Sequence, residues 1–256
     1  MFLLACEGIF IGVVLGLTGA GGGVLAIPLL MWSQSWSVSQ AAPIALIATT
    51  IASGAGTIQG LLQHTVRYKA AIWIALLSIP SVYIGVTLSK IIPIHYITVL
   101  FCIVMLISAC RYFIKKPIKS LNLCHTHEST GRFIWNTKTR GYLGGLGIFL
   151  GIVTGLLGVG GGFILVPTLK KISNLSMCCI SATSLMIIFL VGSIALVTQM
   201  SSGYHYPLSI TFVFVITAFI GMFIGRFLQH YIHEQIIHKV FALLLGCIAI
   251  ITLYRM

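Results

Sequence analysis

Two glycine runs are the residues of this chain best suited to chemistry. Residues 21–23 are followed by Pro28, and residues 160–162 are followed by Pro167. Consecutive glycines leave backbone N–H groups uncovered, and a helix that begins after them adds the positive end of its dipole. Such a site can bind a small anion without a fixed positive charge, and an uncharged site of this kind releases its ligand readily.

The two runs belong to an internal repeat. Residues 12–30 align with residues 151–169, and ten of these nineteen positions are identical, including the three glycines and the proline. Two weaker matches follow downstream. Ala48-Thr49-Thr50 pairs with Ala182-Thr183-Ser184, and Ile84-Gly85 pairs with Ile224-Gly225. The chain is therefore predicted to consist of two related halves.

Glycine and proline inside apolar segments predict interrupted helices. Each glycine costs about 1 kcal/mol relative to alanine in a helix, and non-helical backbone inside a membrane is tolerated only where it is buried in protein or lines a cavity. Interrupted segments at matching positions of two halves indicate a transporter's binding site. The alternative is that the glycines permit close helix packing, which is the role we expect for Gly12, Gly16, Gly151 and Gly155.

The predicted substrate site combines both glycine–proline blocks with the hydroxyls of the weaker repeat. Its candidate residues are Gly19, Gly21, Gly22, Gly23, Pro28, Thr49, Thr50, Gly158, Gly160, Gly161, Gly162, Pro167, Thr183 and Ser184. Two half-helix starts that face each other at the interface of the repeats could hold one oxyanion.

Three ionisable residues are candidates for coupling transport to protons. Glu7 is the only carboxylate in a predicted span, and ionisable groups inside a membrane are functional hypotheses by default. His64 and His205 each lie in the loop after the second span of their half and can titrate near neutral pH. The alternatives are an interfacial carboxylate near the N-terminus and two ordinary loop histidines.

The elements that position these residues are membrane helices. The 256 residues are 58% hydrophobic and only 7% charged, whereas soluble domains carry about 25% charged residues. Long uncharged runs are typical of membrane-spanning helices. We therefore expect an all-α integral membrane protein of about eight transmembrane helices, arranged as two four-helix repeats whose first helices are interrupted. The predicted spans are residues 2–31, 41–62, 70–90, 95–114, 141–170, 177–199, 207–229 and 236–254.

The charge distribution predicts a domain organisation and an orientation. We expect a first transmembrane repeat at 1–114, a basic cytoplasmic linker at 115–140 and a second repeat at 141–256. Basic residues concentrate around the linker, which is typical of a cytoplasmic loop. Four spans per half would place the linker and both termini on the cytoplasmic side of an inner (plasma) membrane, with the halves as parallel repeats.

The remaining composition narrows the class of protein. The chain contains 3 acidic residues and no P-loop lysine motif, so hydrolysis of ATP by the chain itself is not expected. The charge of +12 suits an anionic lipid surface, and no nucleic-acid partner is expected. We also expect no cofactor and no metal; the sequence CHTHE at 124–128 lacks a second ligand cluster. The partners expected are a small anionic substrate and the lipid bilayer.

The doubled block Gly-Leu-x-Gly-x-Gly-Gly-Gly-x(4)-Pro resembles the sulfite exporter TauE/SafE family of membrane permeases. The chain length, the duplication and the basic central linker agree, so the resemblance covers essentially the whole chain. It implies roughly eight spans and export or uptake of sulfite, thiosulfate, organosulfonates or related small anions.

Three functions follow as alternatives. The leading hypothesis is a secondary carrier of a small sulfur-containing anion, with proton coupling as an option. A passive anion channel is the nearest alternative, and an imposed proton gradient would separate the two. An intramembrane serine enzyme is a third, because Ser53-Gly54 and several histidines are present; we expect the protein not to be an enzyme.

Overall fold

The structure is a computed structural model that describes residues 1–19, 22–113, 135–173, 175–200, 208–229, 231–232 and 234–254. The described residues form an all-helical fold, which confirms the predicted class. The helices are α1 (Phe2–Thr18), α2 (Gly22–Gln34), α3 (Val38–Leu62), α4 (Tyr68–Ile91), α5 (Ile94–Phe113), α6 (Thr137–Leu157), α7 (Gly162–Ile172), α8 (Met177–Met200), α9 (Leu208–Leu228) and α10 (Glu234–Tyr254).

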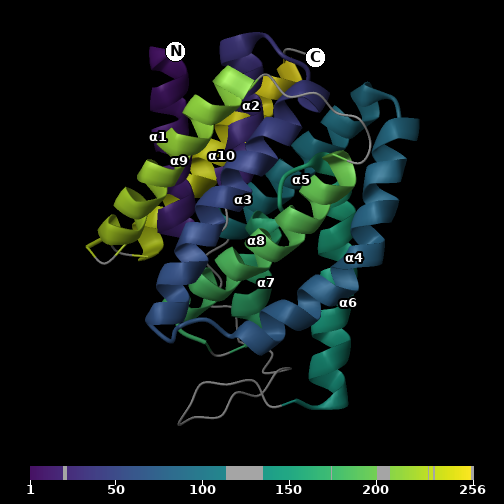
Figure 1. The fold of residues 1–256 in the computed structure, drawn as a ribbon, viewed down its shortest axis with the longest axis vertical. Helices are drawn as coiled ribbons and strands as arrows, with labels where there is room; N and C mark the ends of the chain where they lie inside the picture. Colours follow the sequence, from purple (N-terminus) through teal and green to yellow (C-terminus); the bar gives the residue numbers. More distant parts are fainter. Residues whose placement is uncertain are drawn as a thin grey trace.

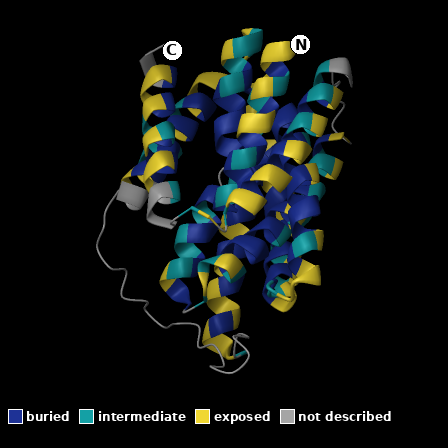
Figure 2. Ribbon diagram, turned by 90° about the vertical axis from the view of Figure 1, so that its left-hand side faces the viewer, coloured by how far each residue is buried: buried dark blue, intermediate teal, exposed yellow. Residues whose placement is uncertain are grey.

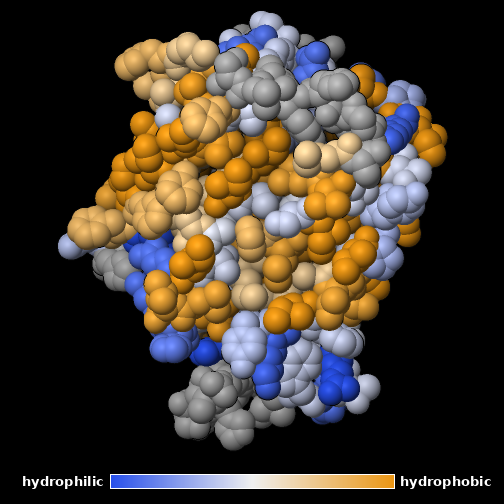
Figure 3. Space-filling view, viewed as in Figure 1, coloured by the Kyte–Doolittle hydropathy of each residue, from blue (hydrophilic) through white to orange (hydrophobic). Residues whose placement is uncertain are grey.

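The exterior of the bundle is apolar. Within the described residues, five helices are long and apolar enough to cross a membrane: α3, α4, α6, α8 and residues Ile210–Leu228 of α9. Residues on the outer faces of the helices are exposed, while those that face neighbouring helices are buried (Figure 2). The face shown in Figure 3 is mostly hydrophobic through its middle, with hydrophilic residues toward both its upper and its lower end. This arrangement is that of a multi-pass membrane protein, in which lipid covers the apolar surface.

The predicted helix interruptions are present at both glycine runs. Helix α1 ends at Thr18 and α2 begins at Gly22, while α6 ends at Leu157 and α7 begins at Gly162. The prolines do not contribute to these breaks, contrary to the sequence prediction, because Pro28 lies inside α2 and Pro167 inside α7. Each lies in the second turn of its helix, where a missing N–H removes one hydrogen bond to the first turn.

Each interrupted pair folds back on itself as a helical hairpin. The Ser33 hydroxyl, at the end of α2, donates a 2.9 Å hydrogen bond to the Glu7 carboxylate, near the start of α1. The chain therefore returns to the face from which it entered, called here the terminal face. The second hairpin returns to the opposite face, the linker face, where Arg67 at the start of α4 contacts Thr183 and Cys179 near the start of α8.

These directions correct the predicted topology. Helices α3, α4 and α5 cross in alternating directions after the first hairpin, so an odd number of crossings precedes the linker. Figure 1 shows both termini at one end of the molecule and the start of α6 at the other. The two repeats are inverted rather than parallel, and the described residues that flank the linker lie at the face opposite the termini. The structure does not confirm four spans per half, because the chain reverses after each glycine run instead of continuing.

The two halves are interlaced by two parallel helix pairs. Helix α1 packs along α9, and α6 packs along α4, which are the most extensive helix contacts in the molecule. A Cβ on Gly12 would collide with the Ala218 carbonyl, and one on Gly151 would lie 2.7 Å from the Ser78 carbonyl oxygen. One turn further on, the same relation joins Gly16 to Met222 and Gly155 to Val82. These glycines permit close packing, as the sequence predicted.

The structure also fixes the register between the repeats. Helix α3 begins at Val38 and α8 at Met177, so equivalent residues in these helices lie 139 positions apart. In this register Thr50 corresponds to Phe189, and the two helices pack through Thr50 against Gly192 and through Phe189 against Gly54. The predicted pairing of Thr49-Thr50 with Thr183-Ser184 is therefore wrong. Short motifs of Thr and Ser recur by chance in apolar helices, and the similarity of these two motifs did not reflect equivalent positions.

Candidate functional site

The starts of the two short helices meet inside the molecule. Helix α2 runs from Gly22 toward the terminal face, and α7 runs from Gly162 toward the linker face (Figure 1). A Cβ on Gly23 would lie 2.6 Å from the Val159 carbonyl oxygen, so the bend of one repeat touches the bend of the other. Two positive helix ends therefore converge at one place. This contact was predicted from the matched glycine runs.

Left-handed glycines form the bends. Gly19 and Gly158 end α1 and α6 with φ of 67° and 69°, and their N–H groups donate 2.8 Å hydrogen bonds to Leu15 and Thr154. In the second bend Gly160 and Gly161 also have positive φ, 69° and 61°. Residues with a Cβ rarely adopt this conformation. The sequence at these positions therefore dictates where each helix stops.

The bends lie deep among apolar side chains. Val24 beside the first bend and Phe163 beside the second are fully buried, as are Gly22 and Gly162 at the helix starts. Low polarity strengthens the interaction of helix N-termini with a negative charge, since little water screens it. The site therefore has the electrostatic character of an anion site built from backbone.

Of the predicted hydroxyls, Thr49 lies nearest a helix start. Its methyl group lies 3.5 Å from the position of a Gly23 Cβ, and its hydroxyl donates to the Ala45 carbonyl at 2.7 Å. The Thr50 hydroxyl is buried against Gly192 and has no hydrogen-bond partner among the described residues. Both hydroxyls belong to α3, which passes beside the first bend.

The two hydroxyls predicted from α8 differ from each other. Thr183 accepts a 3.0 Å hydrogen bond from the Arg67 backbone N–H and donates to Cys179, so it holds the α3–α4 loop at the linker face. Ser184 is fully buried, and its hydroxyl has no partner in the described part of the chain. Thr183 thus has a structural role away from the bends.

Sequence reasoning missed Thr154, the hydroxyl closest to the second bend. Thr154 is fully buried in the last turn of α6, and its oxygen would lie 3.1 Å from a Cβ on Gly161. It has no hydrogen-bond partner among the described residues. The equivalent residue in the first half is Leu15, so comparison of the two halves did not reveal a shared hydroxyl at this position. The available signal was a threonine one helical turn before Gly158.

The proton-coupling candidates do not gather at the bends. Glu7 is half-buried at the terminal face, where it accepts the Ser33 hydrogen bond. His64 is exposed at the linker face with φ of 54°. Two predicted residues, Gly21 and His205, and the sequence at 124–128 lie outside the described residues.

Comparison with known proteins found a family model and relatives that match nearly the whole chain. The family model "Sulfite exporter TauE/SafE" matches residues 4–252. A Bacillus subtilis (strain 168) protein named "Probable membrane transporter protein YunE" is 25% identical over 96% of this chain and 95% of its own length. Proteins named "Probable membrane transporter protein" from two strains of Xylella fastidiosa, 9a5c and Temecula1, are each 24% identical over 97% of this chain and 93% of their own length. No solved structure matches the chain.

Proposed function

This chain belongs to the sulfite exporter TauE/SafE family, and from that premise we propose that it is a secondary transporter of a small sulfur-containing oxyanion or organosulfonate. Sulfite is the first candidate cargo. The relatives that match over nearly their whole length are named as membrane transporters, which supports transport rather than an enzymatic reaction. The cargo binds where α2 and α7 begin.

One observation carries the proposal: a helix start from each repeat reaches the same interior place, where Gly23 and Val159 touch. Backbone N–H groups and helix dipoles stabilise a negative charge at such an end. Inverted repeats with interrupted helices at their interface are a recurrent architecture of secondary transporters. An anion at this place would contact both halves at once, so movement of one half relative to the other could transfer it between faces.

The donors suit an oxyanion. The hydroxyl of Thr154 supplements the backbone at the second bend, and that of Thr50 lies on the neighbouring helix α3. Neutral donors bind an anion more weakly than an arginine fork does. A carrier needs such moderate binding, because its cargo must leave as readily as it enters.

In this conformation the bends are closed on each other. The Val159 carbonyl oxygen points at the start of α2, at Gly23, where a bound anion would otherwise accept hydrogen bonds. A carbonyl oxygen and an anion repel one another, so binding requires the bends to separate. The two hairpins, which open toward opposite faces, are the elements whose displacement would admit cargo from one side at a time.

The linker face is proposed to be cytoplasmic. Nine Lys and Arg side chains are described, and eight of them lie toward this face. They are Arg67, Lys69, Lys138, Arg140, Lys170, Lys171, Arg226 and Lys239. Only Lys90, in the last turn of α4, lies at the terminal face. Basic residues mark the cytoplasmic side, so both termini face outward, which reverses their predicted location.

The alternative functions fare differently. A passive anion channel would use the same bends, and saturation of the flux and its dependence on an imposed proton gradient separate a carrier from a channel. A serine enzyme is disfavoured because the Ser53 hydroxyl is fully buried and donates a 2.9 Å hydrogen bond to the Thr50 carbonyl within its own helix.

The proposal is tested by uptake into liposomes containing the purified protein. The panel is sulfite, thiosulfate, a sulfonate, sulfate and acetate, each with and without an imposed pH gradient. We expect saturable movement of one sulfur-containing anion. Dependence on the gradient identifies a proton-coupled carrier, and Glu7→Gln then tests whether Glu7 carries the proton.

Two results would contradict the proposal. Flux that never saturates indicates a channel rather than a carrier. Equal transport of acetate and every sulfur anion removes the proposed specificity. The control is protein-free liposomes of the same lipid composition.

A further inference from the structure

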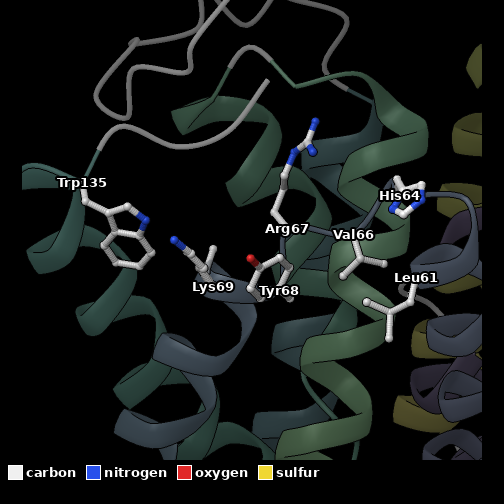
Figure 4. A pocket seen from close by; sticks show the side chains of 8 residues that line it. Leu61, His64, Val66, Arg67, Tyr68, Lys69 and Trp135 are labelled. Atoms are coloured by element: carbon white, nitrogen blue, oxygen red, sulfur yellow. The ribbon is translucent and has the colours of Figure 1, made fainter. Parts of the chain in front are cut away.

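A cavity lined by basic and aromatic residues lies at the linker face, separate from the glycine bends. It has a volume of about 280 Å³ and lies between the α3–α4 loop and Trp135, two residues before the start of α6 (Figure 4). The residues that line it include Leu61, His64, Arg67, Tyr68, Lys69 and Trp135. Residues far apart in sequence thus form one pocket, which the site proposed for the cargo does not use.

The pocket is positively charged. Arg67 and Lys69 supply a guanidinium and an ammonium group, and His64 adds an imidazole. Figure 4 shows the Lys69 side chain extending toward the Trp135 ring. The Arg67 Nε is buried and has no hydrogen-bond partner in the described part of the chain. The pocket also surrounds the first residues of α4, whose N-terminal dipole favours a negative ligand.

Aromatic and apolar residues give the pocket the character of a membrane interface. Tyr68 and Trp135 are amphipathic rings of the kind that anchor proteins at headgroup level, and Trp135 packs edge-on against Trp73 at 6.3 Å. The two helices joined by the pocket loop also carry exposed apolar side chains in the turns nearest that loop. They are Ile58, Leu61 and Leu62 on α3 and Ile72 and Leu76 on α4. An amphiphile with its headgroup in the pocket would lay its chains along these helices.

We propose that this pocket binds the phosphate headgroup of an anionic phospholipid such as phosphatidylglycerol. Basic pockets between membrane helices on the cytoplasmic side recognise such headgroups. A soluble phosphate monoester shares the charge chemistry but has no chains for the apolar surface beneath the pocket. The adjoining apolar surface therefore favours the lipid as the source of the phosphate.

The bound lipid would stabilise the joint between the two repeats. The backbone N–H of Arg67 donates to the Thr183 hydroxyl, and the Arg67 guanidinium lies 3.8 Å from the Cys179 sulfur. The pocket loop is thereby attached to α8, which belongs to the other half. A ligand that binds only the folded arrangement raises the stability of that arrangement by mass action.

The test measures thermal unfolding of the purified full-length protein in detergent with added lipid. Dioleoyl phosphatidylglycerol is titrated against dioleoyl phosphatidylcholine, and glycerol 3-phosphate serves as the soluble probe. We expect phosphatidylglycerol to raise the unfolding temperature and the other two to leave it unchanged. Lys69→Gln should weaken the apparent affinity for phosphatidylglycerol about fivefold, the size expected for loss of one basic residue at a lipid surface.

The matched control is Lys171→Gln, which removes the same charge from an exposed residue of the linker face outside the pocket. It should leave the affinity unchanged. An equal loss in Lys171→Gln would overturn the proposal, because the lipid would then respond to surface charge in general. Stabilisation by glycerol 3-phosphate equal to that by the lipid would overturn the lipid as ligand. Arg67→Gln retains the backbone hydrogen bond to Thr183 and removes the second cationic side chain of the pocket. It should also weaken the apparent affinity for phosphatidylglycerol.

Discussion

The two helical hairpins share a backbone plan and differ in what they bring to the bends. At equivalent positions, the first hairpin has Leu15, whose Cβ lies 2.8 Å from the position of a Gly22 Cβ, and the second has Thr154 beside Gly161. Both side chains are buried, but only threonine offers a hydrogen bond. At this pair of positions the first bend therefore has only apolar packing, and the second has an additional hydroxyl donor. Duplication preserved the geometry while the chemistry of the halves diverged.

A second contrast concerns the interlacing helix pairs. Their glycine contacts are equivalent turn by turn, yet the α1–α9 pair continues to Arg226, whereas the α6–α4 pair has Val86 at the equivalent position. Arg226 is 4% exposed and donates from Nε to the Gln59 side chain at 3.4 Å. The glycine contacts of the two helix pairs are thus symmetric, whereas the buried arginine is found in only one pair, toward the linker face.

The largest expected effect concerns the faces to which the hairpins open. Ser37 and Ser176 are exposed residues at equivalent positions, directly after the first and second hairpins. In a cysteine-free background, a membrane-impermeant thiol reagent applied to intact cells should label Ser37→Cys and not Ser176→Cys. Opening the cells should make Ser176→Cys reactive.

Labelling of both positions from the same side would show parallel repeats and contradict the inverted arrangement. Labelling of only Ser176→Cys in intact cells would keep the repeats inverted but reverse the proposed orientation.

The bends themselves should be intolerant of side chains. Gly161→Val requires valine at φ of 61° and places its Cβ 2.7 Å from Leu150, while Gly22→Val places a Cβ 2.8 Å from that of Leu15. We expect both variants to insert in the membrane and to lose transport, measured by liposome uptake. Gly145→Val on α6, where a Cβ meets nothing within 4 Å, should transport normally.

Normal transport by both bend variants would show that the glycine bends do not form the site. Loss of activity in one variant alone would assign the cargo mainly to that repeat.

The smallest effect tests the difference between the hairpins. Thr154→Val keeps the shape and removes a hydroxyl that has no partner among the described residues. Transport should therefore fall about tenfold, as for loss of a hydrogen bond to a charged ligand. Thr87→Val removes an exposed hydroxyl that bonds within its own helix and should have no effect. Unchanged uptake by Thr154→Val would make the bends functionally equivalent despite their different residues.

The repeat and the places of the helix breaks could be predicted from sequence because glycine acts locally. A run of glycines disfavours helix whatever surrounds it, and the same run at residues 21–23 and 160–162 marked both bends. Composition in turn fixed the membrane class, since helices that contact lipid must be apolar.

The direction of the chain after each bend could not be predicted in this way. Whether α2 continues α1 or reverses depends on contacts such as Ser33 with Glu7, 26 residues apart. The number of apolar runs is the same in both cases, so counting them cannot distinguish a continuing helix from a reversed one. For this reason the sequence predicted parallel repeats where the structure has inverted ones. The lipid pocket was equally inaccessible, because Trp135 and the α3–α4 loop are distant in sequence and meet only in the folded bundle.

The interlacing of the halves also constrains how the protein is made. Gly8 of α1 packs against Thr217 of α9, 209 residues later in the chain. At about 5–20 residues per second of synthesis, the first helix waits roughly 10–40 s for its partner after it leaves the ribosome. During that interval its glycine-lined face has no native neighbour in the bilayer. Assembly therefore completes only near the end of translation, and a truncated first half would enter the membrane without its principal packing surface.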